Sequence, residues 1–177
     1  MSPSAYIGFG SNLGDRKTKF HEAVRSLAQL PNTCVKAKSR LYETDPVGIT
    51  DHGPKFLNAV ILIDTELLPR ELMEGMRVIE LELGKSISHR SDKSRLIDLD
   101  LLLYENKHVR EEGFEIPHPR MHQRAFVLVP LAELDPIILI PTLGRTVTDL
   151  IRTLPEKEIT GVKPLKDGDD PDEHHVT

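Results

Sequence analysis

One nine-residue segment, 95–103, constrains the fold of this chain more than any other. Apart from the arginine that opens it and two aspartates two positions apart, it is entirely apolar. Such a run between polar flanks predicts a buried β-strand. Because successive side chains of a strand point to opposite faces, Asp98 and Asp100 should project side by side from one face, together with Leu102. The other face would then carry Ile97, Leu99, Leu101 and Leu103.

Two neighbouring carboxylates on an apolar strand call for a compensating cation. Each is costly to bury and the two repel each other, and a divalent metal relieves both effects. Mg²⁺ is favoured because the ligands are hard oxygens. The alternative is an edge strand whose aspartates face water, which is the usual environment of a carboxylate. The apolar flanks, and Arg95 placed to hold an anion beside the metal, favour metal-assisted phosphate chemistry.

The order of the predicted elements indicates an α+β fold. The expected elements are strands over 5–10, 33–42, 56–64 and 95–103, a helix that ends at Pro31, and a helix over 69–84, with loops over 43–54 and 85–94. This order is the split βαβ pattern of a ferredoxin-like sandwich, with an antiparallel sheet and both helices on one face. Apolar segments over 126–134 and 147–154 predict additional C-terminal helices on the outside of that core.

Composition bounds the organisation and the partners. A chain of 177 residues with 38% hydrophobic and 29% charged residues suits one soluble domain. We expect this domain over residues 1–160 and an acidic, disordered tail over 161–177; removing its charged segment 166–173 leaves a nearly neutral body. That body gives no support for a nucleic-acid partner, and no run is long enough for a membrane span. The single cysteine, Cys34, excludes an internal disulfide, fits the cytoplasm, and is expected to be a half-buried strand residue.

Two local patterns suggest other ligands but lack the context that those ligands need. Gly8 and Gly10, followed by Gly14, do not have the spacing of a dinucleotide-binding turn and are better explained by a strand-to-helix turn. His118 and His122 have the spacing of zinc ligands on a helix, but a proline lies between them.

Four stretches in register resemble the hydroxymethyldihydropterin pyrophosphokinases of folate biosynthesis. They are residues 6–15 (YIGFGSNLGD), 42–48 (YETDPVG) with 56–59 (FLNA), 95–100 (RLIDLD) and 117–126 (PHPRMHQRAF). The resemblance covers residues 5–155 and implies the ferredoxin-like fold expected above. It also implies transfer of pyrophosphate from ATP to the hydroxymethyl group of 6-hydroxymethyl-7,8-dihydropterin, with AMP as the second product.

The resemblance assigns residues to ATP and metal. Asp98 and Asp100 would hold two Mg²⁺ ions that bridge the ATP phosphates, and Arg95, His118 and Arg124 would grip those phosphates. The catalytic set is then Arg95, Asp98, Asp100 and Arg124, and Glu80, Lys85 and Leu101 join the ATP-binding set. Without the resemblance, Glu80 would be a solvated residue on the exposed side of its helix.

The resemblance also assigns a pterin site. Phe56 and Phe126 would sandwich the flat ring, and the amide of Asn58 suits the mixed donor and acceptor edge of a pterin. The loop around Thr44 to Val47 would add backbone contacts to the pterin. Without the resemblance, both phenylalanines would be assigned to ordinary core.

One segment departs from the family pattern. Family members carry several arginines and a Trp-Gly-Pro ahead of the acid pair, whereas residues 85–94 read KSISHRSDKS, with Asp92 where the tryptophan is expected. Two alternatives therefore stay open: an ATP- or pterin-binding module with little turnover, and a small ferredoxin-like interaction domain with an incidental acid pair. For the enzyme we expect ATP and the pterin as partners and a monomer, with association with other folate enzymes left open.

Overall fold

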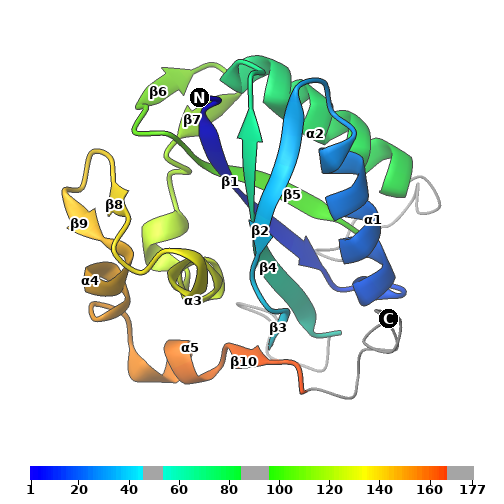
Figure 1. Ribbon diagram of the computed structural model, residues 1–177. Helices are drawn as coiled ribbons and strands as arrows, with labels where there is room; N and C mark the ends of the chain where they lie inside the picture. Colours follow the sequence, from blue (N-terminus) through cyan, green and yellow to red (C-terminus); the bar gives the residue numbers. More distant parts are fainter. Residues whose placement is uncertain (46–53, 85–95, 167–177) are drawn as a thin grey trace, which may run out of the picture.

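A six-stranded antiparallel sheet forms the centre of the molecule (Figure 1). The computed structural model describes residues 1–45, 54–84 and 96–166. The long strands are β1 (Ser4–Ser11), β4 (Phe56–Thr65) and β5 (Asp98–Tyr104), and the short ones are β2 (Thr33–Lys38), β3 (Tyr42–Thr44) and β10 (Lys163–Pro164). The strand order is β10-β3-β4-β1-β5, and β2 pairs with β4 beyond the end of β3. β5 therefore lies at an edge of the sheet.

Two helices cover one face of this sheet, as predicted. α1 (Arg16–Ala28) connects β1 to β2, and α2 (Pro69–Gly84) connects β4 to β5. The carboxylate of Asp15 accepts the backbone N–H of Thr18 and caps α1. Buried side chains at helical spacing join both helices to the sheet; they are Phe20, Ala23, Leu27, Leu72, Met76 and Ile79. The α+β, ferredoxin-like prediction is confirmed.

The opposite face carries a second core. The elements after β5 are β6 (Val109–Glu111), β7 (Phe114–Ile116), the 3₁₀ turn Met121–Gln123, α3 (Ala125–Leu134), β8 (Leu139–Ile140), β9 (Arg145–Thr146), α4 (Val147–Ile151) and α5 (Glu156–Thr160). Leu128 and Leu131 of α3 and Val147 of α4 pack with Val60 and Leu102 of the sheet. The predicted C-terminal helices thus exist, but instead of lying outside a single core they build one of their own (Figure 1).

The strand predicted over 33–42 is interrupted. β2 ends at Lys38 and β3 begins at Tyr42, so the segment predicted as a loop from residue 43 starts inside a strand. In the sequence, uncharged and charged residues alternate from position 35 to position 41 without a break, which is why the pattern did not reveal the interruption. Cys34 is exposed rather than half-buried, because it shares the outer face of β2 with the lysines at 36 and 38.

A β-bulge corrects the predicted faces of β5. Tyr6 pairs with Leu103 and Ile7 with Leu101, so Leu102 is an extra residue with no partner on β1. Leu103 consequently packs in the α3 core and Tyr104 in the α1/α2 core, whereas strict alternation had placed Leu103 with Leu101.

The folded part of the chain extends beyond the domain end predicted at residue 160. Residues 161–166, assigned above to the tail, include β10, which pairs with β3, and Val162, which is buried beside Tyr42. Within the described ranges, no helix combines the length and apolar character that a membrane crossing requires.

Candidate active site

A row of paired residues crosses the sheet on the α3 face. Tyr42 of β3 pairs with Asn58 of β4, Asn58 pairs with Gly10 of β1, and Gly10 pairs with Asp98 of β5. In the neighbouring row, Gly8 pairs with Asp100. Two strand spacings separate Asn58 from Asp98, about 10 Å. The acid pair and the amide thus lie on one face, with glycine between them.

The acid pair is half-buried at the edge of the sheet, and a third carboxylate approaches it from α2. Glu80 Oε2 accepts the backbone N–H of Leu99 at 3.4 Å. Burial, followed by the negative charge of Asp98, raises the pKa of Glu80 to about 7. The side chain is therefore half-buried against the acid pair, and the expectation that it lies on the exposed side of its helix is wrong. This concentration of negative charge suits a cationic ligand.

The three carboxylates do not form a complete metal cage. Among the described residues, no group of three or more His, Cys, Asp or Glu side chains is arranged to hold an ion. The donor set at Asp98 and Asp100 is two hard oxygen ligands. This fits Mg²⁺, which is commonly bound through one or two carboxylates and completes its coordination with waters and substrate phosphates.

A histidine and an arginine lie next to the acid pair. The backbone N–H of His118 donates to the Leu102 carbonyl at 2.9 Å, which places His118 directly beside β5. Burial and the nearby charge of Arg124 lower the pKa of His118, so the imidazole is neutral at neutral pH. Its Nδ1 accepts the backbone N–H of Arg120 at 3.3 Å. Nε2 therefore carries the proton and can donate to an anion.

Arg124 lies near His118 and also contacts an aromatic ring. It occupies the N-cap position of α3, and its guanidinium carbon lies 5.6 Å from the centre of the Phe126 ring. Phe126 is only partly buried against the α3 core, and Phe56, at the start of β4, is also half-exposed. Both rings therefore retain free surface, in contrast to the fully buried phenylalanine at position 20.

The amide of Asn58 is held in a fixed orientation. Asn58 Nδ2 donates to Thr44 Oγ1 at 2.8 Å, and both residues are buried. A methyl group built on Gly10 would lie 3.4 Å from Asn58 Oδ1, so this oxygen faces the space above Gly10. The Thr44 contact consumes one donor and leaves the amide with a carbonyl oxygen and a second N–H for a ligand.

The remaining predicted residues are not at this surface or cannot be placed. Leu101 packs its side chain in the α1/α2 core, on the face opposite the acid pair, so any contact with a nucleotide would come from its backbone. Val47, Lys85 and Arg95 lie outside the described residues.

Three polar contacts near the site were not anticipated. Arg16 donates to the Glu43 carboxylate and to the Lys55 carbonyl, both at 2.7 Å, on the α1 side of β3. Tyr42 donates to the carboxylate of Glu133 on α3. The partners are 27, 39 and 91 positions apart, and no local sequence signal connects them.

The fold and these groups together define a class of protein. A ferredoxin-like sandwich that gathers acidic groups, a cationic arginine and a rigid amide on one face is a transferase built for a phosphate-bearing substrate. The chain belongs to the 7,8-dihydro-6-hydroxymethylpterin-pyrophosphokinase (HPPK) family, whose model matches residues 6–136.

Relatives named for this activity extend over most of the chain. The 2-amino-4-hydroxy-6-hydroxymethyldihydropteridine pyrophosphokinase of Methylorubrum extorquens is 43% identical over 159 residues, which cover 90% of this chain and 98% of the relative. The protein of the same name from Bacillus subtilis is 46% identical over 134 residues, 76% of this chain and 79% of the relative.

Solved structures support the fold. Wild-type HPPK-DHPS of Plasmodium falciparum superposes with a TM-score of 0.67 at 14% sequence identity. The match covers 86% of this chain and 44% of the solved one, so this chain spans less than half the length of that protein.

Proposed function

We propose that this chain transfers pyrophosphate from ATP to the hydroxymethyl group of 6-hydroxymethyl-7,8-dihydropterin in folate synthesis, as a cytoplasmic monomer. The products are AMP and the pterin diphosphate. The observation that carries the proposal is the cross-strand row, which sets the acid pair and the Asn58 amide about 10 Å apart on one face. A flat heterocycle at the amide would then present its hydroxymethyl group toward the phosphates at the acid pair.

In the reaction, the pterin hydroxyl oxygen bonds to the β-phosphorus of ATP, and the bond from that phosphorus to the oxygen bridging the α- and β-phosphates breaks. AMP leaves with the bridging oxygen, and the hydroxyl proton is released to water. Positioning of the two substrates and neutralisation of phosphate charge supply most of the catalysis.

Asp98 and Asp100 would hold Mg²⁺, and we propose two ions. When bound, the metal neutralises charge on the phosphates and orients them. Burial and then the charge of Asp98 raise the pKa of Glu80, and this gathering of three carboxylates supports cation binding at this position.

The neighbouring cationic and neutral donors would bind the phosphates. Nε2 of neutral His118 donates a hydrogen bond to a phosphate oxygen, and the Arg124 guanidinium offers paired donors and a positive charge. Arg95 and Lys85 are proposed to add further contacts from the segment that precedes the acid pair.

The pterin would lie above Gly10. Asn58 presents a carbonyl oxygen and an N–H to its edge, with the orientation maintained by Thr44. The half-exposed rings of Phe56 and Phe126 are proposed to stack on its two sides, where offset aromatic contacts are favourable.

The test is ³¹P NMR of the purified protein with ATP, Mg²⁺ and the pterin, with Asp98→Ala in parallel. We expect AMP and pterin diphosphate from the wild type and neither from the variant. ADP as product would mean that a single phosphoryl group is transferred. ATP binding without AMP would favour the alternative, a binding module with little turnover.

A further inference from the structure

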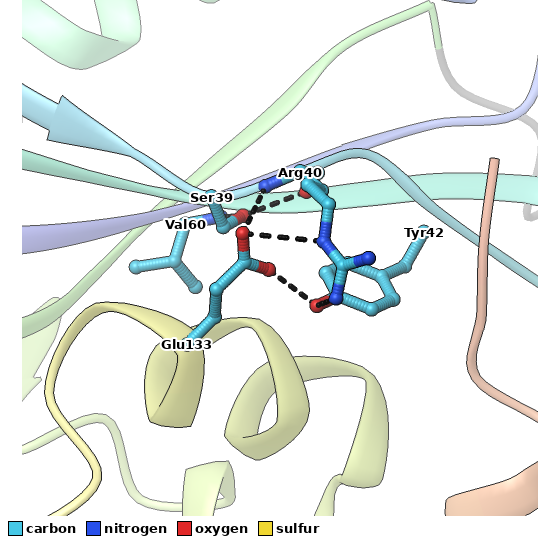
Figure 2. Close-up of polar contacts among 5 residues, drawn as sticks. All are labelled: Ser39, Arg40, Tyr42, Val60 and Glu133. Atoms are coloured by element: carbon cyan, nitrogen blue, oxygen red, sulfur yellow. Dashed lines mark hydrogen bonds and ion pairs between the residues drawn. The ribbon is translucent and has the colours of Figure 1, made fainter. Parts of the chain in front are cut away.

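A polar cluster remote from the acid pair joins α3 to the interrupted edge of the sheet (Figure 2). The carboxylate of Glu133, in the last turn of α3, receives the hydroxyl of Tyr42 on one oxygen. Its other oxygen accepts the backbone N–H of Arg40 at 3.0 Å and lies 3.4 Å from Arg40 Nε. One helical side chain therefore accepts two hydrogen bonds, from Arg40 and Tyr42, and forms an ion pair with Arg40, at the end of the interruption between β2 and β3.

The interruption of the strand explains why this carboxylate is needed. At Ser39 the chain still pairs with Val60: the Ser39 N–H donates to the Val60 carbonyl, and Ser39 Oγ accepts the Val60 N–H, both at 2.9 Å. Beyond that point the backbone leaves the ladder, and the Arg40 N–H turns toward α3. Glu133 supplies an acceptor for this backbone donor and so holds the segment against α3.

The cluster connects the two elements that would enclose the pterin: the strands that carry Asn58 and Thr44, and α3, which carries Phe126. Tyr42 pairs with Asn58 and belongs to the same short strand as Thr44. Glu133 and Phe126 are seven residues apart on α3, so they lie on the same side of the helix about 10 Å apart. The distance between Asn58 on the sheet and Phe126 on α3 is thereby tied to the contact between Tyr42 and Glu133.

We propose that Glu133 is a positioning residue for pterin binding: through Tyr42 and Arg40 it fixes α3, and hence Phe126, against the strands that carry Asn58 and Thr44. The inference rests on the proposed function for the identity of the ligand. Glu133 itself touches no substrate. Its effect should therefore appear in pterin affinity and leave the ATP side of the site unchanged.

The experiment compares Glu133→Ala, Glu133→Gln and Tyr42→Phe with the wild type. For Glu133→Ala we expect the KM for pterin to rise about tenfold, with kcat within about threefold and the KM for ATP unchanged. Glu133→Gln should restore part of the affinity, because an amide oxygen still accepts from Tyr42, and Tyr42→Phe should raise the KM for pterin about threefold.

The matched control is Glu111→Gln. Glu111 of β6 also pairs with an arginine of a helix, Arg70 of α2, but on an exposed surface away from the row. Glu111→Gln should leave all kinetic constants unchanged. A lower melting temperature for the Glu133 variants with a wild-type KM for pterin would overturn the proposal, because the carboxylate would then be only structural.

A binding titration separates this inference from the proposed function. Pterin affinity is measured directly in the presence of Mg²⁺ and a non-hydrolysable ATP analogue. If the wild type binds pterin but makes no AMP, the proposed activity fails, and the Glu133 variants still decide the positioning role. If the wild type binds no pterin, both proposals are overturned.

Discussion

The two faces of the sheet use the same strands for different purposes. The α1/α2 face is largely apolar, with Phe9, Ile61 and Leu99 packed under the helices. On the α3 face, the residues next to these in sequence include Gly10 and Asp98. Because successive strand residues alternate between faces, each strand contributes to the α1/α2 core on one side, and to the site and the α3 core on the other. The comparison suggests that stability and chemistry can be perturbed separately.

The largest effect should come from the acid pair. Asp98→Asn should lower kcat/KM about 10³-fold by weakening cation binding, while the free energy of unfolding stays the same or rises because repulsion with Asp100 and Glu80 is relieved. Steady-state kinetics and urea unfolding measure the two quantities. The control is Asp64→Asn, which removes a carboxylate from the end of β4 far from Asn58. Its kcat/KM should remain within about threefold of wild type.

A substitution in the α1/α2 core should lower stability and leave the kinetic constants unchanged. Leu72 of α2 is fully buried in the α1/α2 core, and Leu72→Ala should lower the free energy of unfolding by about 3 kcal/mol through lost contacts and a cavity. At a temperature where the variant is folded, its KM values and kcat should equal those of the wild type. A changed KM for pterin would mean that the two faces are coupled.

A pair of glycine substitutions sharpens the comparison within the α3 face. A methyl group at Gly10 meets only Asn58 Oδ1, at 3.4 Å, whereas one at Gly8 meets the side chain of Leu102 at the same distance. Gly10→Ala should therefore fold normally and raise the KM for pterin about tenfold, or about 1.4 kcal/mol, by occupying ligand space. Gly8→Ala should affect that KM less. Equal KM values for the two variants would contradict the placement of the pterin above Gly10.

The smallest predicted effect is a pH dependence of the free energy of unfolding, through Glu80. The folded-state pKa of Glu80 is about 7, above the ordinary value of 4.5. The folded protein therefore holds a proton that the unfolded chain releases between pH 4.5 and 7, and stability falls as pH rises through this window. In metal-free buffer at pH 8, Glu80→Gln should be more stable than wild type by about 1 kcal/mol, after allowance for solvent screening of a half-buried group.

Urea unfolding at several pH values measures this difference, which should vanish well below pH 4.5, where the carboxyl is protonated in both states. Glu82→Gln, at an exposed position on the same helix, is the control. A constant difference across the whole range would show that the substitution acts through packing and not through charge.

Local patterns were sufficient to predict the fold and one side of the site. Helical spacing identified the buried faces of α1 and α2, and alternation placed Asp98 and Asp100 together. The β-bulge could not be predicted, because residues 101–103 are all leucine and any register keeps them apolar. The interruption at 39–41 was hidden for a similar reason, since charged and uncharged residues continue to alternate in the sequence as far as residue 41.

The rest of the site depends on contacts between distant parts of the chain. Without the resemblance Glu80 was expected in solvent, because a helical position reveals its own face but not that the edge strand β5 begins beside it. The contact between Tyr42 and Glu133 joins residues 91 positions apart. Such contacts follow from how α2 and α3 pack on the sheet, which periodicity does not encode.

In the proposed pterin site, Gly10 contributes main-chain atoms as the floor, and this has a consequence for inhibition. A compound that rests on this floor loses no contact when residue 10 is substituted, because there is no side chain to remove. Every replacement adds atoms, and these obstruct the natural substrate as well as the compound. Drug resistance arising at this position would therefore carry a loss of folate synthesis with it.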